Sequence, residues 1–437
     1  MRYHIETFGC QMNNNDSERI AHYLERCNYQ PASSLKEADL IVVNMCSVRQ
    51  SAVDRVYGLI PKFKELKKKN PDLKTVLTGC VLKQDQKKLK SKFDYILSKK
   101  TLRQWDQFLE QDQWDYLPDP RNEKFQQQYD ADYFEIPPKN QEKARVYVPI
   151  STGCDNFCSF CVVPHARGPE VCRDPNEIEQ EVRQAVKRGA KEIWLLGQNV
   201  NSYQQRTDRK KITFADLLRR VSDIEGKFRI KFTSSNPEDF DQRSIEALAE
   251  LDRVAPYLNL PLQSGNDEIL DKMNRPYSVQ QYQRVVQETR KAFQRKNSGP
   301  LSLSTDIIVG FPGETKRQFR DTVEVFKEMK FDMAYIAQYS PRPRTAASKL
   351  KDDVSQEEKK RREKVLTEIL KRQALEFNRQ FTGETTTVVT LNKEQRLIGK
   401  TKQNKTVKFP GSKDLIGKFA SVKVKKASPW GLTGKLI

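Results

Sequence analysis

Long apolar runs are missing from this sequence. Apolar residues make up 37% of the 437 residues and charged residues 31%. No stretch approaches the ~18 consecutive apolar residues that a membrane-spanning helix needs. The amino-terminus also lacks the basic segment, apolar segment and small-residue cleavage site of a secretory signal peptide. We therefore expect a cytoplasmic protein without a membrane partner.

Histidine is scarce, whereas cysteine is informative. His4, His22 and His165 are the only histidines, and none of them forms a compelling acid–base pair with another residue, so the sequence identifies no general base. The chain has eight cysteines. In a cytoplasmic protein, cysteines that follow a pattern indicate metal ligation or catalysis rather than a disulfide framework.

Negative charge is under-represented. Lys and Arg outnumber Asp and Glu by 78 to 58, which gives a formal net charge of +20. Residues 377–437 alone carry 13 Lys and Arg against 3 Asp and Glu, so about half of the excess lies there. Such an excess favours a polyanionic partner such as nucleic acid. A solvated, lysine-rich surface is the alternative interpretation.

The pattern of apolar segments divides the chain into three regions and a linker. Residues 1–117 alternate strand and helix patterns, which predicts a parallel α/β sheet. Residues 118–143 show no periodicity and are predicted to be the linker. Residues 144–375 repeat the strand–helix unit six times, which predicts an open, partial (βα)6 barrel. Residues 376–437 show five short strand patterns between Gly and Lys turns, as in small oligonucleotide-binding (OB-like) β-barrels. The six strands of the partial barrel are expected at residues 146–150, 192–196, 229–233, 257–261, 303–309 and 333–339.

One cysteine motif directly follows the first predicted barrel strand. Cys154, Cys158 and Cys161 form the pattern C-x3-C-x2-C, at the strand end where barrel active sites form. Three thiolates can hold three irons of a 4Fe-4S cluster and leave the fourth iron free for a cofactor. A zinc site would need a fourth ligand at short range, for which His165 and Cys172 are the candidates, and chance spacing is the other alternative.

A second set of cysteines is dispersed in the sequence. Cys10, Cys46 and Cys80 each lie at the carboxyl end of a predicted strand in the first region. Because these ends share one edge of a parallel sheet, the three residues should converge. This favours a second cluster over structural or redox-active thiols. Cys27 and Cys172 fall outside both patterns and are expected to be unligated.

The cysteine patterns carry a resemblance to known families. A C-x3-C-x2-C motif that directly follows the first strand of a partial barrel resembles the radical-SAM superfamily. Two cysteine triads followed by a basic β-barrel resemble the methylthiotransferase family over essentially the whole chain. The resemblance implies an N-terminal cluster-binding domain, a radical-SAM barrel and a C-terminal TRAM barrel. The segments that match the family's motifs are TFGCQMNNNDSE, NMCSVRQSA, CDNFCSFCVVPHARGPE, LNLPLQSGNDEILDKMNR, DIIVGFPGET and YSPRPRT.

The resemblance also implies cofactors and a reaction. These are two 4Fe-4S clusters and S-adenosylmethionine, which would serve both as methyl donor and as the source of a 5′-deoxyadenosyl radical. GCQMN and LNLPLQSG are similar to the branch that acts on isopentenylated adenosine next to the anticodon of tRNA. Threonylcarbamoyl-adenosine in tRNA and an aspartate of a ribosomal protein are the alternative substrates. The expected partners are tRNA, an electron donor such as a flavodoxin or ferredoxin, and a sulfur source, and we expect a monomer.

A different class of protein remains an alternative. A non-catalytic iron–sulfur protein that binds RNA or senses redox state would share the clusters and the basic barrel. It would not need the open iron position that C-x3-C-x2-C provides.

Polar residues near the ends of the barrel strands are the expected cofactor contacts. Each of them is equally compatible with a capping or turn role. Phe160, which precedes the third cysteine of the motif, is expected either to pack near the adenine of the cofactor or to fill the core. The polar and glycine candidates are Gly197, Gln198, Asn199, Ser234, Gln263, Asp306 and Arg275.

Lysines of the C-terminal barrel are the expected RNA contacts. They would bind phosphates, which positions RNA without reading its sequence. Base selection is therefore expected at the mouth of the radical-SAM barrel. Phe409 is expected either to stack on a base or to pack in the core. The lysine candidates are Lys400, Lys402, Lys405, Lys408 and Lys418.

Overall fold

The computed structural model describes the chain apart from residues 111–114, 117–132, 140–143, 207–210, 296–298 and 394–395. The described residues form two compact units. Unit 1 comprises residues 1–141, 152–155 and 161–173, and unit 2 comprises residues 142–151, 156–160 and 174–437. Most of the predicted linker lies outside the described residues. The part that is described, 133–139, packs on unit 1 through the buried side chains of Tyr133, Phe134 and Ile136.

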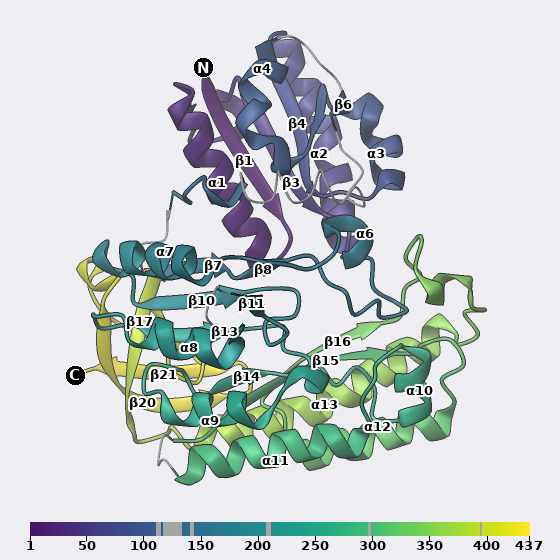
Figure 1. The fold of residues 1–437 in the computed structure, drawn as a ribbon, viewed down its shortest axis with the longest axis vertical. Helices are drawn as coiled ribbons and strands as arrows, with labels where there is room; N and C mark the ends of the chain where they lie inside the picture. The colour runs from purple at the N-terminus through teal and green to yellow at the C-terminus, as the bar shows by residue number, and fades with distance from the viewer. Residues whose placement is uncertain (111–114, 117–132, 140–143, 207–210, 296–298, 394–395) are drawn as a thin grey trace. The chain divides into compact units, whose positions relative to one another are not determined.

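Unit 1 is built on a parallel sheet. Its described strands lie in the order β2-β1-β3-β4-β5-β6, and the helices α1 and α2 flank the sheet (Figure 1). The strands are β1 (Arg2–Phe8), β2 (Gln30–Pro31), β3 (Leu40–Cys46), β4 (Lys74–Cys80), β5 (Tyr95–Leu97) and β6 (Asp115–Tyr116). The helices are α1 (Gln11–Arg26), α2 (Gln50–Lys69), α3 (Lys83–Leu89), α4 (Trp105–Glu110) and the short α6 (Val163–Arg167).

The central strand β3 shows why this sheet needs helices on both faces. Side chains of a strand alternate between its two faces. Leu40 and Val42 pack into one apolar core together with α1, whereas Ile41 and Val43 pack into the other together with α2. All seven residues of β3 are buried. The parallel α/β sheet predicted for this region is confirmed.

Unit 2 contains the partial barrel, and its six expected strands are present within two residues of the predicted bounds. They pair in parallel as two groups, β13-β10-β7 and β14-β15-β16. The strands are β7 (Arg145–Pro149), β10 (Glu192–Leu196), β13 (Arg229–Phe232), β14 (Tyr257–Asn259), β15 (Ser302–Val309) and β16 (Met333–Gln338). The helices between and after them are α7 (Pro175–Lys187), α8 (Phe214–Ser222), α9 (Gln242–Glu250), α10 (Asp267–Lys272), α11 (Val279–Arg295), α12 (Lys316–Met329) and α13 (Gln356–Arg379). A short antiparallel pair consists of β11 (Gln204–Arg206) and β12 (Lys211–Thr213). The cysteine segments add β8 (Ser151–Thr152) and β9 (Val171–Cys172), of which β9 belongs to unit 1.

Local sequence explains where these helices begin. Asp174 caps α7 by accepting a hydrogen bond from the Asn176 backbone N–H at 2.7 Å, and Pro175 occupies the first helical position. Thr315 forms a reciprocal capping box with Gln318 at the start of α12. Such caps satisfy backbone donors that the first turn of a helix leaves unpaired.

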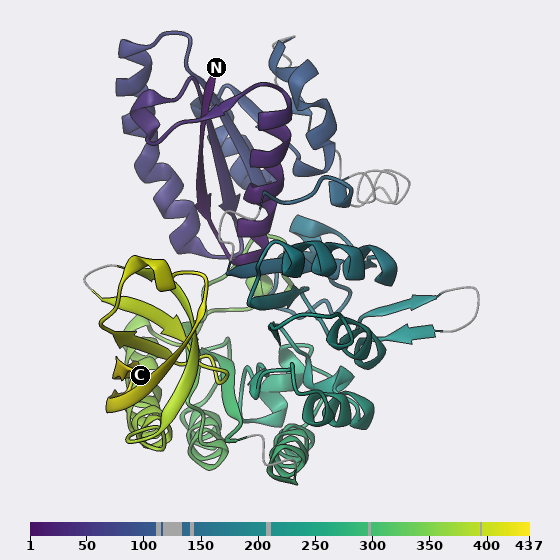
Figure 2. The same cartoon turned by 90° about the vertical axis from the view of Figure 1, so that its left-hand side faces the viewer.

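The carboxyl-terminal strands of unit 2 form a closed barrel in the order β17-β18-β19-β21-β20 (Figure 2). Its apolar core includes Val388, Leu397, Val407 and Phe409. Phe409 is fully buried there, so the core-packing alternative for this residue is confirmed. The strands are β17 (Thr385–Lys393), β18 (Leu397–Lys400), β19 (Thr406–Phe409), β20 (Phe419–Ser428) and β21 (Gly431–Leu436).

Candidate functional site

The three dispersed cysteines of unit 1 lie at one edge of the sheet. Cys46 and Cys80 are the last residues of β3 and β4 and are paired in register. Cys10 follows β1 and is the N-cap residue of α1. The amide of Asn13 connects the set, because its oxygen accepts from the Cys10 thiol at 3.4 Å and its nitrogen lies 3.9 Å from the Cys80 sulfur. The expected convergence of these strand ends is therefore present in the structure.

The electrostatic surroundings of Cys80 favour its thiolate. A hydrogen bond from Cys46 lowers the pKa of Cys80, and the positive charges of Arg167 and Lys99 act in the same direction against the effect of burial. The same hydrogen bond, together with burial, raises the pKa of Cys46. Thiolates rather than thiols ligate iron. Cys80 is thus held in the form that a metal ligand requires.

An iron–sulfur cluster does not require its thiolates to meet at one point. Among the described residues, no group of three or more His, Cys, Asp and Glu side chains is arranged to hold a single metal ion. In a 4Fe-4S cluster each iron takes its own cysteine, so the sulfurs stay apart. Three cysteines on one sheet edge, with buried positive charge beside them, fit such a cluster chemically.

Sequence reasoning missed the charged residues behind Cys80. Arg167, from α6, donates from Nε to the Cys80 sulfur at 3.0 Å and from NH2 to Asp16 at 3.0 Å. Lys99 donates to the same Asp16 oxygen at 2.7 Å, and Tyr133 donates to the other oxygen at 2.6 Å. Burial opposes ionisation of Asp16, yet Lys99 and Arg167 lower its pKa below the ordinary value. The sequence feature that could have drawn attention to Arg167 is its position in the segment CVVPHARGPE, which begins with Cys161 of the C-x3-C-x2-C motif.

The C-x3-C-x2-C segment begins after a glycine whose surroundings leave no room for a Cβ atom. Gly153 has φ of +80°, and a Cβ built on it would lie 1.7 Å from the carbonyl oxygen of Pro169. The Cys154 backbone N–H then donates to the Gly168 carbonyl at 3.1 Å. Gly153 therefore sets the path by which the chain enters the motif.

We predict that Gly153→Ala disrupts this segment. The left-handed backbone costs a non-glycine residue roughly 1–2 kcal/mol, and the contact with Pro169 adds to that cost. Gly189 is a matched control, because its φ is +103° but a Cβ there would meet nothing within 4 Å. Thermal unfolding and iron analysis of the reconstituted proteins should show a larger loss for Gly153→Ala than for Gly189→Ala. Equal losses would show that the contact with Pro169 is unimportant.

Residues 272–275 hold the middle of the motif within unit 2. The Ser159 backbone N–H donates to the Met273 carbonyl at 2.9 Å, and the Asn274 side chain donates to the Phe157 carbonyl at 3.1 Å. Arg275 is buried and donates from NH1 to the Cys158 sulfur at 3.4 Å and from NH2 to Asn236 at 2.7 Å. The structure thus places Arg275 against a cysteine of the motif, and its contact with the cofactor stays a prediction.

Phe160 lies half-buried beside an apolar cluster that contains Ile269, Met273, Phe311 and Tyr339. This contact supports core packing and leaves part of the ring accessible. A role near the cofactor stays a prediction. Cys27 and Cys172 are both half-buried, at the end of α1 and in β9 respectively, and their unligated state also stays a prediction.

Two of the expected cofactor residues have strained backbones at strand ends. Ser234 follows β13 with φ of +65°, and Gln263 follows β14 with φ of +66°. A left-handed conformation is uncommon for residues other than glycine and is concentrated at functional sites. Gln263 exchanges backbone hydrogen bonds with β15, and Asp306 of β15 accepts from the Asn259 side chain at 3.2 Å.

The residues after β10 lie where polar atoms are buried without partners. Gly197 closely approaches Ser151, since a Cβ at Gly197 would lie 2.8 Å from the Ser151 hydroxyl. Within the described part of the chain, no hydrogen-bond partner is found for four buried oxygens, namely the side-chain oxygens of Gln198 and Asn199 and the hydroxyls of Ser151 and Ser235. Native proteins rarely leave buried polar atoms unsatisfied. A polar ligand at these strand ends would supply the missing partners.

The lysines proposed for RNA contact fall into two groups. Lys402, Lys408 and Lys418 are exposed. Lys405 is buried, bonds the Asp332 carboxylate and lies 4.8 Å from the centre of the Phe377 ring. Lys400 is largely buried, and burial lowers its pKa to about 8. Lys405 and Lys400 are thus engaged within unit 2, Lys405 with Asp332 and Lys400 with the Thr406 hydroxyl at 2.8 Å, and their contact with RNA stays a prediction.

Exposed lysines that the sequence analysis did not select lie on β20 and β21. Lys423 and Lys435 are paired across these strands, and Lys425 and Lys426 are exposed as well. Trp430, in the turn between the strands, is 54% exposed. The alternation of FASVKVKKAS could have identified these side chains as outward-facing.

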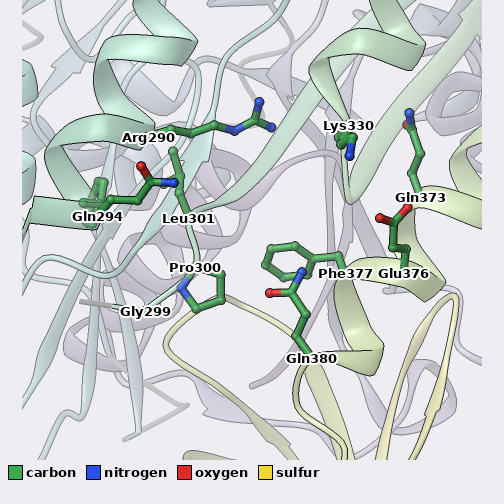
Figure 3. Close-up of a pocket in the computed structure, with 11 residues that line it drawn as sticks. Arg290, Gln294, Gly299, Pro300, Leu301, Lys330, Gln373, Glu376, Phe377 and Gln380 are labelled. Atoms are coloured by element: carbon green, nitrogen blue, oxygen red, sulfur yellow. The ribbon is translucent and has the colours of Figure 1, made fainter. Parts of the chain in front are cut away.

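A pocket of about 330 Å³ is lined by none of the cysteines or the expected cofactor residues (Figure 3). It is formed by the ends of α11, α12 and α13 and by the segment before β15, and Arg290, Lys330 and Phe377 are among its lining residues. It therefore adjoins the amino end of β15, whereas barrel active sites lie at the carboxyl ends of strands.

Among the described residues, no helix is long and apolar enough to span a membrane.

The fold and the two cysteine patterns define an iron–sulfur enzyme of the radical-SAM class. Family comparison matches residues 148–326 to the radical SAM superfamily, residues 380–437 to the TRAM domain, and residues 2–98 to a family described as uncharacterized, UPF0004. The radical-SAM match implies a 4Fe-4S cluster and S-adenosylmethionine as cofactors. The C-terminal closed barrel is the TRAM domain.

Full-length relatives specify the family further. The chain is 39% identical over 444 residues to a tRNA-2-methylthio-N(6)-dimethylallyladenosine synthase of Clostridium botulinum (strain Loch Maree / Type A3), with 100% of this chain and 97% of the relative covered. A Thermoanaerobacter sp. (strain X514) protein of the same name is 37% identical over 450 residues, with 100% and 92% covered. The chain belongs to the family of tRNA-2-methylthio-N(6)-dimethylallyladenosine synthases.

Solved structures support the fold alone. TsrM from Kitasatospora setae, a radical S-adenosylmethionine methyltransferase solved with cobalamin and a [4Fe-4S] cluster, matches with a TM-score of 0.57. The identity is 14%, and the match covers 79% of this chain and 77% of that one. The cobalamin-dependent radical enzyme OxsB, in its apo form, gives a TM-score of 0.52 at 12% identity, with 85% and 56% covered.

Proposed function

We propose that this protein adds a methylthio group to the adenine C2 of N6-isopentenyladenosine next to the anticodon of tRNA. S-adenosylmethionine serves both as methyl donor and as radical source. One observation carries the proposal, namely that Cys10, Cys46 and Cys80 share one sheet edge in a chain that also contains C-x3-C-x2-C. The full-length relatives with the corresponding name support the same substrate.

Each cysteine triad has a separate role in this proposal. Cys154, Cys158 and Cys161 hold the cluster that binds S-adenosylmethionine, and Cys10, Cys46 and Cys80 hold an auxiliary cluster. When bound, the first cluster supplies the electron that yields the 5′-deoxyadenosyl radical, and the second supplies a site for the sulfur to be inserted. A radical is needed because the aromatic C2–H of adenine is not acidic and offers no leaving group.

The chain's own polar residues would orient the cofactor. Gln198, Asn199 and Ser151 follow strands of the barrel and present buried polar atoms without partners. These atoms match a ligand with an amino acid head group, which both donates and accepts hydrogen bonds. Ser234 and Gln263, with their left-handed backbones, shape neighbouring strand ends. Asp306 lies in the next strand, where Asn259 orients it.

The TRAM domain would bind tRNA through the exposed lysines of its outer strands. Lys408, Lys423 and Lys435 lie on neighbouring strands of the closed barrel, and Lys402 and Lys418 extend the basic surface. Side chains of this type bind phosphates and release counterions. Exposed Trp430 offers an aromatic face for base stacking.

We predict that replacing Lys408, Lys423 and Lys435 together by Ala weakens tRNA binding in a salt-dependent way. Each phosphate contact contributes about 0.7–0.9 to the slope of log affinity against log salt concentration. The slope should therefore become shallower by about 2 to 3. Replacement of Lys187, Lys291 and Lys360, which are exposed on helices of unit 2, removes the same charge and should leave the slope nearly unchanged. Equal changes in the two variants would place the RNA elsewhere.

The function is tested by reconstituting the protein anaerobically with iron and sulfide and supplying reductant, S-adenosylmethionine and isopentenylated tRNA. Mass analysis of the nucleosides should show the methylthio product, and Cys154→Ala should abolish it. Parallel reactions contain tRNA with threonylcarbamoyl-adenosine and a ribosomal protein substrate. Product in one of these alone would identify a different methylthiotransferase. If the iron-loaded protein forms no methylthio product and no 5′-deoxyadenosine, that result would favour the non-catalytic RNA-binding alternative.

The remaining partners follow from this chemistry. Reductive cleavage of S-adenosylmethionine requires an electron donor such as a flavodoxin or ferredoxin, and repeated turnover requires a sulfur source. The proposed substrate places the activity in the cytoplasm, and we propose that the protein acts as a monomer.

A further inference from the structure

Arg167 is a buried cation whose hydrogen bonds point at a proposed cluster ligand. It ends the short helix α6 and is 5% exposed. Its Nε donates to the Cys80 sulfur at 3.0 Å, and its NH2 donates to Asp16 at 3.0 Å. One guanidinium therefore bridges a cysteine at the sheet edge and a carboxylate of α1.

The carboxylate of Asp16 alone does not balance the positive charges around Arg167. Asp16, which is 1% exposed, is shared by Arg167 and Lys99, and Lys99 is itself buried. Two cations therefore face one carboxylate, and a thiolate at Cys80 would supply the second negative charge. Burial of unbalanced charge is costly unless another charge compensates it. Ligation of a cluster through Cys80 would keep that negative charge in place beside Arg167.

Arg167 also retains an unused donor. Its NH1 is buried and has no hydrogen-bond partner among the residues that the structure describes. If this arginine served only in a structural salt bridge, each of its buried N–H donors would be expected to form a hydrogen bond. The unpaired NH1 leaves a donor for an anionic group beside Cys80 when the protein is loaded.

We infer that Arg167 is a positioning residue that fixes Cys80 and stabilises the reduced, more negative state of the auxiliary cluster. The inference rests on the proposed function, because it requires a cluster at Cys10, Cys46 and Cys80. Hydrogen bonds to cysteine sulfur and nearby positive charge raise the reduction potential of an iron–sulfur cluster. Asp16 holds the guanidinium in place. Because Asp16 is shared with Lys99, it neutralises only part of the positive charge near Cys80.

A potentiometric titration followed by electron paramagnetic resonance tests the inference. The titration uses the full-length chain with Cys154, Cys158 and Cys161 replaced by Ala, so that only the auxiliary cluster contributes a signal. At a fixed potential, Arg167→Met should decrease the ratio of reduced to oxidised cluster by at least about tenfold, which is a shift of about 59 mV for one electron. Arg167→Lys, which keeps the charge, should shift the ratio less.

Arg19 is the matched control. It is also buried in unit 1, but its donors go to Asn15 and to the carbonyl of Phe134 at 2.9 and 3.0 Å. Arg19→Met should leave the ratio unchanged. A wild-type ratio in Arg167→Met, or an equal shift in Arg19→Met, would overturn the inference.

Cluster assembly provides a second measurement if a neutral variant binds no iron. Iron retained by Arg167→Lys but lost from both Arg167→Met and Arg167→Gln would support the need for a charge. Iron lost from these three variants and from Arg19→Met alike would indicate general damage and overturn the inference. Failure of the proposed function looks different, because the starting protein would then show no auxiliary cluster signal before Arg167 is changed.

Discussion

Replacing Cys10, Cys46 and Cys80 together by Ala is expected to abolish the methylthio product while 5′-deoxyadenosine is still formed. These residues lie on the sheet edge of unit 1, and the variant leaves C-x3-C-x2-C intact. Loss of residues around the ligands of a metal site costs about 10–100-fold in activity. Loss of the ligands themselves should exceed about 100-fold. Nucleoside and small-molecule mass analysis of the same reaction measures both products.

Cys27 and Cys172 provide the control for this prediction. Both are half-buried cysteines outside the two triads, and their replacement by Ala should leave both products at wild-type levels within a few-fold. If the triple variant still made methylthiolated tRNA, the sulfur would have to come from another site. If it made neither product, the two triads would not act separately.

Glu192→Ala is expected to cause a large loss of stability. The Glu192 carboxylate is fully buried at the start of β10, where it bonds Lys231 and accepts two hydrogen bonds from Arg145 at 3.0 Å. Removing the only anion of this group leaves two buried cations, and breaking a buried ion pair costs about 3–5 kcal/mol. The thermal midpoint should fall by about 10 °C, as measured by calorimetry.

The same group predicts a pH dependence. Burial disfavours the charged form of Glu192, but Lys231 and Arg145 lower its pKa to about 2. A lowered carboxylate pKa stabilises the folded state above the unfolded pKa and loses this effect as pH falls through the folded one. The difference between wild type and Glu192→Ala should therefore shrink as pH falls from about 4.5 towards 2.

An exposed ion pair gives the comparison for Glu192. Glu288 pairs with Arg284 on the surface of α11 at 2.8 Å, and such pairs contribute about 0–1 kcal/mol. Glu288→Ala should thus change the thermal midpoint by little. A similar small change in Glu192→Ala would contradict the role assigned to the buried group.

Strand ends explain how much of the site the sequence could predict. Apolar runs locate strands, and the residue after each run then lies at a known edge of a parallel sheet. This is why Cys10, Cys46 and Cys80 could be brought together although 35 and 33 residues lie between them. The same reasoning selected Ser234 and Gln263, which have the strained backbones expected at a functional site.

Side chains that fold back onto a distant element could not be assigned in this way. Lys405 looks like the other lysines of a basic barrel, but it is engaged inside unit 2 because it bonds Asp332 of the segment before β16. Arg167 acquires its role only through Asp16 and Lys99, which are remote in sequence. No periodicity marks such contacts. They depend on tertiary structure that the local pattern does not specify.

Iron analysis with Mössbauer spectroscopy on three reconstituted proteins tests the central claim most directly. The claim is that two separate cysteine triads each hold one 4Fe-4S cluster. Wild type should bind about eight irons per chain, and a variant with either triad replaced by Ala should bind about four. The two variants should show distinct four-iron spectra that together reproduce the wild-type spectrum. Wild-type protein with only about four irons, or a variant of Cys10, Cys46 and Cys80 that keeps all its iron, would contradict the account.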